Sequence, residues 1–202
     1  MDLSLFPIPE SEQRRARGLR LANKAQRTND LTMASSAILL LTPLADVDCV
    51  DIPALDALAS SYELIGDVTS AQTLLIRALK LAPRNESVLQ GLLTNSQHRG
   101  QPEESLRYLN KLHQLYPDDG RIVYQLAQIL NQLGRTTEAW EAVEKAVQLL
   151  PNDLTVRAAA VQLARKLGQT EVADAQQAII DRMLSATAAA SAGNLQPSSK
   201  DR

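Results

Sequence analysis

The sequence predicts an all-α fold built from helical hairpins that repeat along the chain. Three prolines lie 34 residues apart: Pro83, Pro117 and Pro151. Three glycines keep the same spacing: Gly66, Gly100 and Gly134. Between these markers, apolar residues recur every three or four positions, as they do on one face of an α-helix. A glycine between two such runs favours a tight turn because it accepts a positive φ, and a proline after the second run ends a helix.

The period defines three clear repeats, at residues 52–85, 86–119 and 120–153. In the first predicted helix of each repeat, the seventh position is always leucine: Leu58, Leu92 and Leu126. In the second helix, the twentieth position is always small: Ala71, Ser105 and Ala139. A two-helix unit cannot bury its apolar stripe alone, so each repeat is expected to pack against its neighbours.

These columns resemble the tetratricopeptide repeat family, whose unit is a helix–turn–helix of 34 residues. The best copy is 52–85, and the residues that carry the resemblance there are Leu58, Ala59, Tyr62, Gly66, Ala71, Ala78 and Pro83. Several aromatic positions of the family pattern hold aliphatic residues, in keeping with an aromatic content of only 3%. The resemblance implies a right-handed α/α superhelix of three clear repeats with degenerate flanking repeats.

Weaker repeats extend the pattern in both directions. Residues 15–51 read as a degenerate first repeat with Asn29 at the glycine position and a longer linker after it. Residues 154–184 read as a capping repeat with Gly168 at the turn. Its second helix departs from the pattern because Gln177 replaces an apolar residue, and a more polar outer face is what the end of a repeat array requires.

The two ends of the chain differ from the repeats. Residues 1–14 form an N-terminal leader, expected to be partly ordered, whose two prolines oppose a regular helix and whose apolar side chains favour docking in extended form: Leu3, Leu5, Phe6 and Ile8. Residues 185–202 form a tail rich in Ala and Ser. From about Ala190 onward it lacks the apolar content to pack, so a disordered tail is expected.

The sequence offers no catalytic, cofactor-binding or metal-binding pattern. Neither His98 nor His113 has a second ligand at metal-binding spacing. A glycine-rich phosphate loop and a nucleophile elbow are both absent from the sequence. The adjacent carboxylates at 103–104 and 118–119 fall at turns or helix starts, where they favour the positive end of a helix dipole. We therefore expect a protein that is not an enzyme and that needs no cofactor.

Charge and hydropathy favour a cytoplasmic location. The apolar run at 37–41 is too short to span a bilayer and begins too late for a signal peptide. Cys49 is the only cysteine and so forms no internal disulfide. The net charge of −2 and a hydrophobic content of 45% are ordinary for a globular domain.

One basic stretch stands out near the N-terminus. Four cations spaced three or four residues apart share one helix face: Arg17, Arg20, Lys24 and Arg27. This basic patch has two interpretations, a solvated outer face of a capping helix or a docking face for an acidic partner, anionic lipid or nucleic acid. The sequence pI of about 5.7 and the few aromatic residues give no clear nucleic-acid or membrane signal.

The resemblance also implies a partner-binding groove formed by the first helix of each repeat. Its candidate residues are Gln90, Thr94, Gln97, His98, Arg121, Tyr124, Gln125, Gln128, Asn131 and Gln162. Amide side chains both donate and accept hydrogen bonds, which suits the backbone of a peptide.

One well-known function of the family is excluded by this register. Family members that clamp the acidic C-terminal peptide of heat-shock chaperones use Lys and Asn at the fifth and ninth positions of a repeat. The corresponding pairs here are Asp56 and Ser60, Gln90 and Thr94, and Tyr124 and Gln128. Without that clamp, such a peptide is expected to bind no more tightly than millimolar.

The leading hypothesis is a non-catalytic interaction module, an adaptor or scaffold that holds a protein or peptide segment in the groove, with Tyr124 as an aromatic anchor. A second hypothesis is a cytosolic chaperone similar to the class II chaperones of type III secretion, which combine N-terminal helices with about three such repeats. A third is a regulatory subunit whose basic helix binds anionic lipid or nucleic acid. Homodimerisation through an exposed end of the array is a further hypothesis.

Overall fold

The computed structural model describes residues 9–45 and 51–193, and these residues form ten α-helices and no strand. The all-α prediction is therefore confirmed. The chain divides into two compact units, one that ends at Leu115 and one that begins at Tyr116. We refer to them as unit 1 and unit 2.

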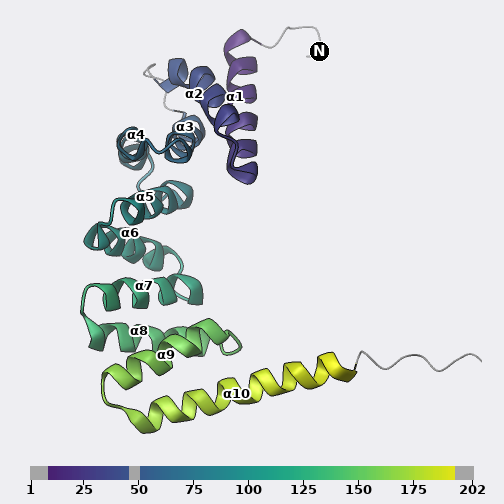
Figure 1. Ribbon diagram of the computed structural model, residues 1–202. Helices are drawn as coiled ribbons and strands as arrows, with labels where there is room; N and C mark the ends of the chain where they lie inside the picture. Colours follow the sequence, from purple (N-terminus) through teal and green to yellow (C-terminus); the bar gives the residue numbers. More distant parts are fainter. Residues whose placement is uncertain (1–8, 46–50, 194–202) are drawn as a thin grey trace, which may run out of the picture. The chain divides into compact units, whose positions relative to one another are not determined.

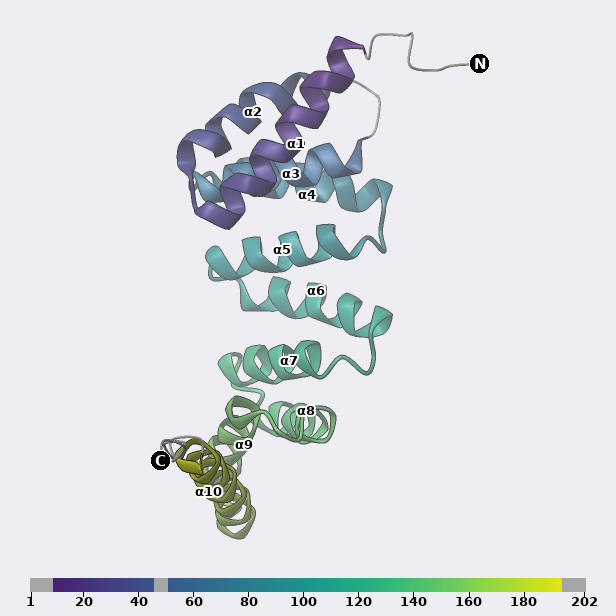
Figure 2. The same cartoon turned by 90° about the vertical axis from the view of Figure 1, so that its right-hand side faces the viewer.

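The described residues of unit 1 form three helical hairpins, whose helices can be followed in Figures 1 and 2. The first pairs α1 (Glu10–Thr28) with α2 (Leu31–Ala45). The second pairs α3 (Ile52–Leu64) with α4 (Val68–Leu81), and the third pairs α5 (Glu86–His98) with α6 (Pro102–Leu115). The first helices α1, α3 and α5 contact one another in sequence order, and α2 contacts α3 just as α4 contacts α5. Both helices of a hairpin therefore pack on the first helix of the next hairpin.

Unit 2 contains two hairpins. Helix α7 (Gly120–Gln132) pairs with α8 (Thr136–Leu149), and α9 (Leu154–Lys166) pairs with α10 (Thr170–Gly193). Contacts between α8 and α9 join the two hairpins. Each of Pro83, Pro117 and Pro151 follows the end of a second helix, as the period predicts.

The turns explain the periodic glycines. Gly66, Gly100, Gly134 and Gly168 all have positive φ, between 65° and 87°. In the described residues the only other residue in this conformation is Asn29, at φ 52°, and it occupies the same position of the first hairpin. A left-handed turn residue therefore recurs in all five hairpins, and asparagine is among the few non-glycine residues that adopt this conformation readily.

Side-chain caps fix where the first helices begin. Asp51, Asn85, Asp119 and Asp153 each precede a first helix and accept a hydrogen bond from a backbone N–H of its first turn. Helices α3, α5, α7 and α9 therefore begin at residues 52, 86, 120 and 154, where the 34-residue period places the repeat starts.

The core follows the periodic apolar columns. Leu58, Leu92 and Leu126 are buried, and so are the small residues at the twentieth position. Ser105 fits this small, buried position because its hydroxyl lies 2.8 Å from the hydroxyl of Ser96 and also donates to the Gln101 carbonyl. The polar exception in the alanine column is thus satisfied inside the hairpin.

A glycine lets the two helices of the first hairpin pack closely together. A Cβ at Gly18 would lie 2.6 Å from Leu41 Cδ2 and 3.3 Å from Leu40 Cβ, so glycine allows α1 and α2 to approach closely. Helix α1 begins at Glu10, within the segment assigned to the leader, because Pro9 precedes the first turn and Glu10 and Glu12 favour the positive end of the helix dipole.

Helix α10 continues to Gly193, beyond the boundary placed at residue 184. The first part of the segment expected to be disordered is therefore helical. Its many alanines have the highest intrinsic helix propensity among the amino acids, which favours a helix in this segment.

Three expectations fall outside the described residues: docking of the leader at 1–8, the environment of Cys49, and disorder at 194–202. Among the described residues, no helix is both long enough and apolar enough to cross a membrane.

Candidate binding groove

The first helices of unit 1 enclose a cavity of about 240 Å³, which we call the first-helix cavity. Its residues come from α1, α3 and α5, with one side chain from α4. They are Gln26, Ser60, Glu63, Leu75, Ser87, Gln90, Gly91 and Thr94. Hydroxyl groups, amide groups and the Glu63 carboxylate thus surround a small apolar surface supplied by Leu75.

Gly91 lets α5 pack closely against Leu75 at one side of this cavity. A Cβ at this position would lie 2.8 Å from Leu75 Cδ2 and 3.7 Å from Asp56 Oδ1. Any larger residue would therefore have to displace Leu75, which lines the cavity. This contact explains a residue without a side chain in the middle of α5, where glycine is otherwise unfavourable.

Asp56 is half-buried beside the cavity and binds the first turn of the next repeat. The Ser87 hydroxyl donates a hydrogen bond to its carboxylate. Burial raises the pKa of Asp56, and the hydrogen bond from Ser87 opposes this effect in part. The carboxylate is therefore less stable in its charged form here than in water.

Glu63 forms the second contact between α3 and α5. It accepts a hydrogen bond from the side-chain amide of the buried Asn95, and that amide also donates to the Val68 carbonyl at 2.7 Å. Its other carboxylate oxygen lies 2.8 Å from His98 Nδ1. Two groups of α5 therefore hold one carboxylate of α3.

The same contact recurs in unit 2. Lys166 Nζ on α9 donates to Asn131 Oδ1 on α7 at 2.9 Å. Both pairs, His98 with Glu63 and Lys166 with Asn131, join the thirteenth position of one repeat to the twelfth position of the repeat before it. An oxygen acceptor at one position and a nitrogen group at the other thus connect successive repeats.

The predicted groove residues fall into two sets. On α5 of unit 1, Gln90 and Thr94 line the cavity, while Gln97 and His98 are exposed farther along the helix. In unit 2, Tyr124 and Gln125 are half-buried on α7, and the exposed members are Arg121, Gln128, Asn131 and Gln162. Arg121 also forms an ion pair with Asp119 at 3.5 Å.

The basic patch lies along α1. Arg17, Arg20, Lys24 and Arg27 are all exposed, and none forms an ion pair with a carboxylate in the described part of the chain. The neighbouring arginines differ, because Arg14 pairs with Glu10 on its own helix and Arg15 pairs with Asp51, the cap of α3.

Of the residues that line the cavity, only Gln90 and Thr94 were among the groove residues expected from the sequence. Gln26 occupies the twelfth position of the degenerate first repeat, so extending the groove positions to residues 15–51 would have found it. Leu75 belongs to a second helix, which the predicted groove does not use. Its close approach to Gly91 depends on packing that no periodic rule indicates.

Comparison with known proteins agrees with this repeat geometry. The sequence profile of the tetratricopeptide repeat family matches residues 98–163. The chain has the tetratricopeptide repeat fold. No curated protein matches its sequence.

Solved structures of MamA share this fold. A MamA structure designated AMB-1 is 26% identical, with a TM-score of 0.73 over 85% of this chain and 90% of the MamA chain. MamA designated MSR-1 is 24% identical, with a TM-score of 0.71 over 88% and 98% of the two chains. MamA from Desulfovibrio magneticus RS-1 is 17% identical, with a TM-score of 0.72 over 86% and 96%. The repeat fold supports a role in protein interaction or scaffolding.

Proposed function

We propose that this protein is a non-catalytic adaptor that holds a segment of a partner protein on the faces formed by its first helices. The observation that carries the proposal is the first-helix cavity, in which successive repeats present hydroxyl and amide groups around an apolar floor. Ser60 and Gln90 come from different repeats, so one bound segment would contact both. Such groups suit a peptide backbone, which also donates and accepts hydrogen bonds.

The polar pairs next to the cavity support a preformed site. Glu63 is held by Asn95 and His98, and Asp56 by Ser87, so these carboxylates are already partnered before any ligand binds. The groups left to a ligand are uncharged, mainly Gln90 and Thr94. The preferred segment would therefore carry little charge where it crosses the cavity, which also argues against an acidic C-terminal peptide.

The experiment is affinity capture with mass spectrometry on four forms of the full chain. These are the wild type, the Gln90→Ala, Thr94→Ala double variant in unit 1, the Tyr124→Ala, Gln128→Ala double variant in unit 2, and a Gln148→Ala control. Gln148 is exposed on α8, a second helix, and so tests truncation outside the proposed site. Circular dichroism establishes that each variant remains folded.

We expect specific partners to be lost from at least one double variant and retained by the control. Retention of every partner by both double variants would reject the proposal. Recovery of a secreted protein as the bound partner would favour the secretion-chaperone form of the same function. A cytoplasmic location is part of the proposal and is tested by fractionation of the host cells.

A second candidate function rests on the unpaired cations of the basic patch. A regulatory subunit that docks through α1 on anionic lipid or nucleic acid would show salt-sensitive binding to anionic vesicles or DNA. Arg20→Ala, Lys24→Ala should abolish that binding. Equal binding by this variant and the wild type would reject the role of the patch.

A further inference from the structure

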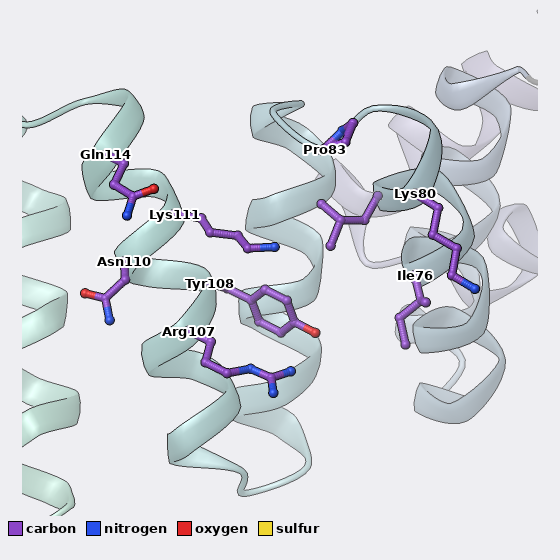
Figure 3. A pocket seen from close by; sticks show the side chains of 9 residues that line it. Ile76, Lys80, Pro83, Arg107, Tyr108, Asn110, Lys111 and Gln114 are labelled. Atoms are coloured by element: carbon purple, nitrogen blue, oxygen red, sulfur yellow. The ribbon is translucent and has the colours of Figure 1, made fainter.

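A second cavity of unit 1, of about 800 Å³, lies between the second helices α4 and α6, and we call it the second-helix groove (Figure 3). It shares no lining residue with the first-helix cavity. One wall belongs to α4 and the linker that follows it, and the other belongs to α6. This surface is not part of the groove predicted from the repeat pattern, because that groove is formed by first helices alone.

The groove has an apolar surface that water reaches. Ile76 is 37% exposed, a high value for a large aliphatic side chain on a packed helix, and it lines the groove with Leu79 and Pro83. From the opposite wall the ring of Tyr108 points toward α4 (Figure 3). Tyr108 is only 6% exposed, so its ring forms a fixed floor and does not project into solvent.

Three cations line the same groove. Lys80 comes from α4, and Arg107 and Lys111 are one turn apart on α6 and point toward α4 in Figure 3. The groove lining contains no carboxylate, and none of the three cations forms an ion pair within the part of the chain that the structure describes. The net charge of the chain is −2, but both walls of this groove carry cations. The groove therefore has a positive local potential, which would attract an acidic ligand.

We propose that the second-helix groove binds an acidic, amphipathic peptide segment of a protein partner. Apolar side chains of the segment pack on Ile76, Leu79 and Pro83, and its carboxylates pair with Lys80, Arg107 and Lys111. Carboxylates that pair with arginine form charge-assisted hydrogen bonds, and the apolar contact excludes water from them. Together with the first-helix face, this groove would let one chain join two partners.

Two other ligand classes fit the groove less well. A membrane surface is engaged by side chains that protrude, whereas the apolar residues here line a recess between two helices. Single-stranded nucleic acid is bound by stacking on exposed aromatic rings, and the Tyr108 ring is buried. A peptide chain can enter the recess and reach cations on both walls.

Fluorescence anisotropy of the full chain with a labelled peptide of Leu-Leu-Glu-Glu repeats tests the proposal. A peptide with Lys in place of each Glu serves as the probe of opposite charge. Arg107→Glu, Lys111→Glu should weaken binding of the acidic peptide by about tenfold or more, since like charges then face it. Ile76→Ser, which leaves the charge unchanged, should also weaken binding.

The matched control is Lys145→Glu, Arg182→Glu, which makes the same change of charge at exposed positions of the second helices α8 and α10 in unit 2. It should leave the affinity unchanged. Equal loss in this control would show nonspecific attraction and overturn the proposal. Binding of phosphatidylserine vesicles that depends on Ile76 and Arg107, without binding of the acidic peptide, would also overturn it, in favour of a membrane.

Discussion

At the residue scale, the first-helix face contains one carboxylate that the fold makes costly to ionise. Asp56 is half-buried between α3 and α5, and burial raises its pKa. A group whose pKa is higher in the folded than in the unfolded chain stabilises folding when protonated. This contribution is lost as the pH rises through the raised pKa, so Asp56 lowers stability at neutral pH relative to a neutral residue.

Asp56→Asn should therefore raise the unfolding midpoint at pH 7, because the amide removes the buried charge and its oxygen still accepts the Ser87 hydroxyl. The gain should fall to zero below about pH 3, where the carboxyl is protonated in folded and unfolded chains alike. Urea unfolding across this range measures it. Asp118→Asn, at an exposed position, is the charge-matched control, and an equal gain there would contradict the role of burial.

At the scale of the helical hairpin, a residue with positive φ forms the turn between the two helices. Gly100 lies at φ 65° between α5 and α6, and Asn29 lies at φ 52° between α1 and α2. Open space surrounds the position where a Cβ at Gly100 would lie, so any cost of substitution there comes from the backbone and not from a clash.

Gly100→Val should lower the melting temperature by about 2–8 °C. A non-glycine residue in this conformation costs about 1–2 kcal/mol, and one kcal/mol shifts the midpoint of a chain of this size by about 2–4 °C. Asn29→Gly introduces a glycine at the corresponding turn of the first hairpin. Because glycine adopts a positive φ readily, this change should leave the midpoint nearly unchanged. Thermal unfolding followed by circular dichroism measures both, and a Gly100→Val chain as stable as the parent would refute the turn requirement.

The hairpins were predictable because turns, caps and apolar columns all repeat with one period. Pro83, Gly66 and Leu58 each mark a backbone or packing requirement that is local to its own repeat. The 34-residue period therefore located helices α3 to α9, and Asn29 located the turn of the first hairpin.

Contacts between repeats could not be predicted from the sequence in the same way. The pairing of Lys166 with Asn131 depends on how far one helix is displaced along the next, which the period alone does not specify. The second-helix groove depends on how α4 and α6 are spaced, and this follows from packing of all the intervening side chains. Helix α10 extends past its repeat because alanine propensity acts without any periodic marker.

At the scale of the whole molecule, stability is distributed over many local terms, as in other repeat proteins. Several of these terms are carboxylates that cap helices or pair with arginine. Arg15 lowers the pKa of Asp51, the side chain of Thr32 lowers that of Asp30, and Ser70 lowers that of Asp67. In unit 2, Arg135 lowers the pKa of Glu138.

A chain with this pattern should lose stability in acid. A carboxylate with a lowered folded-state pKa stabilises folding above the unfolded-state value of about 4, and that contribution disappears as the pH falls through the folded-state pKa. Burial opposes this effect at Asp119, but hydrogen bonds from Arg121 still lower the pKa of that carboxyl, which makes five such groups. Asp56 alone among these carboxyls has the opposite sign. The urea midpoint at pH 3 should therefore lie below that at pH 7, and Asp51→Asn should show a smaller difference because it removes one of the five. A midpoint that is equal or higher at pH 3 would mean that the buried carboxyl, and not the caps and ion pairs, governs the acid response of the folded chain.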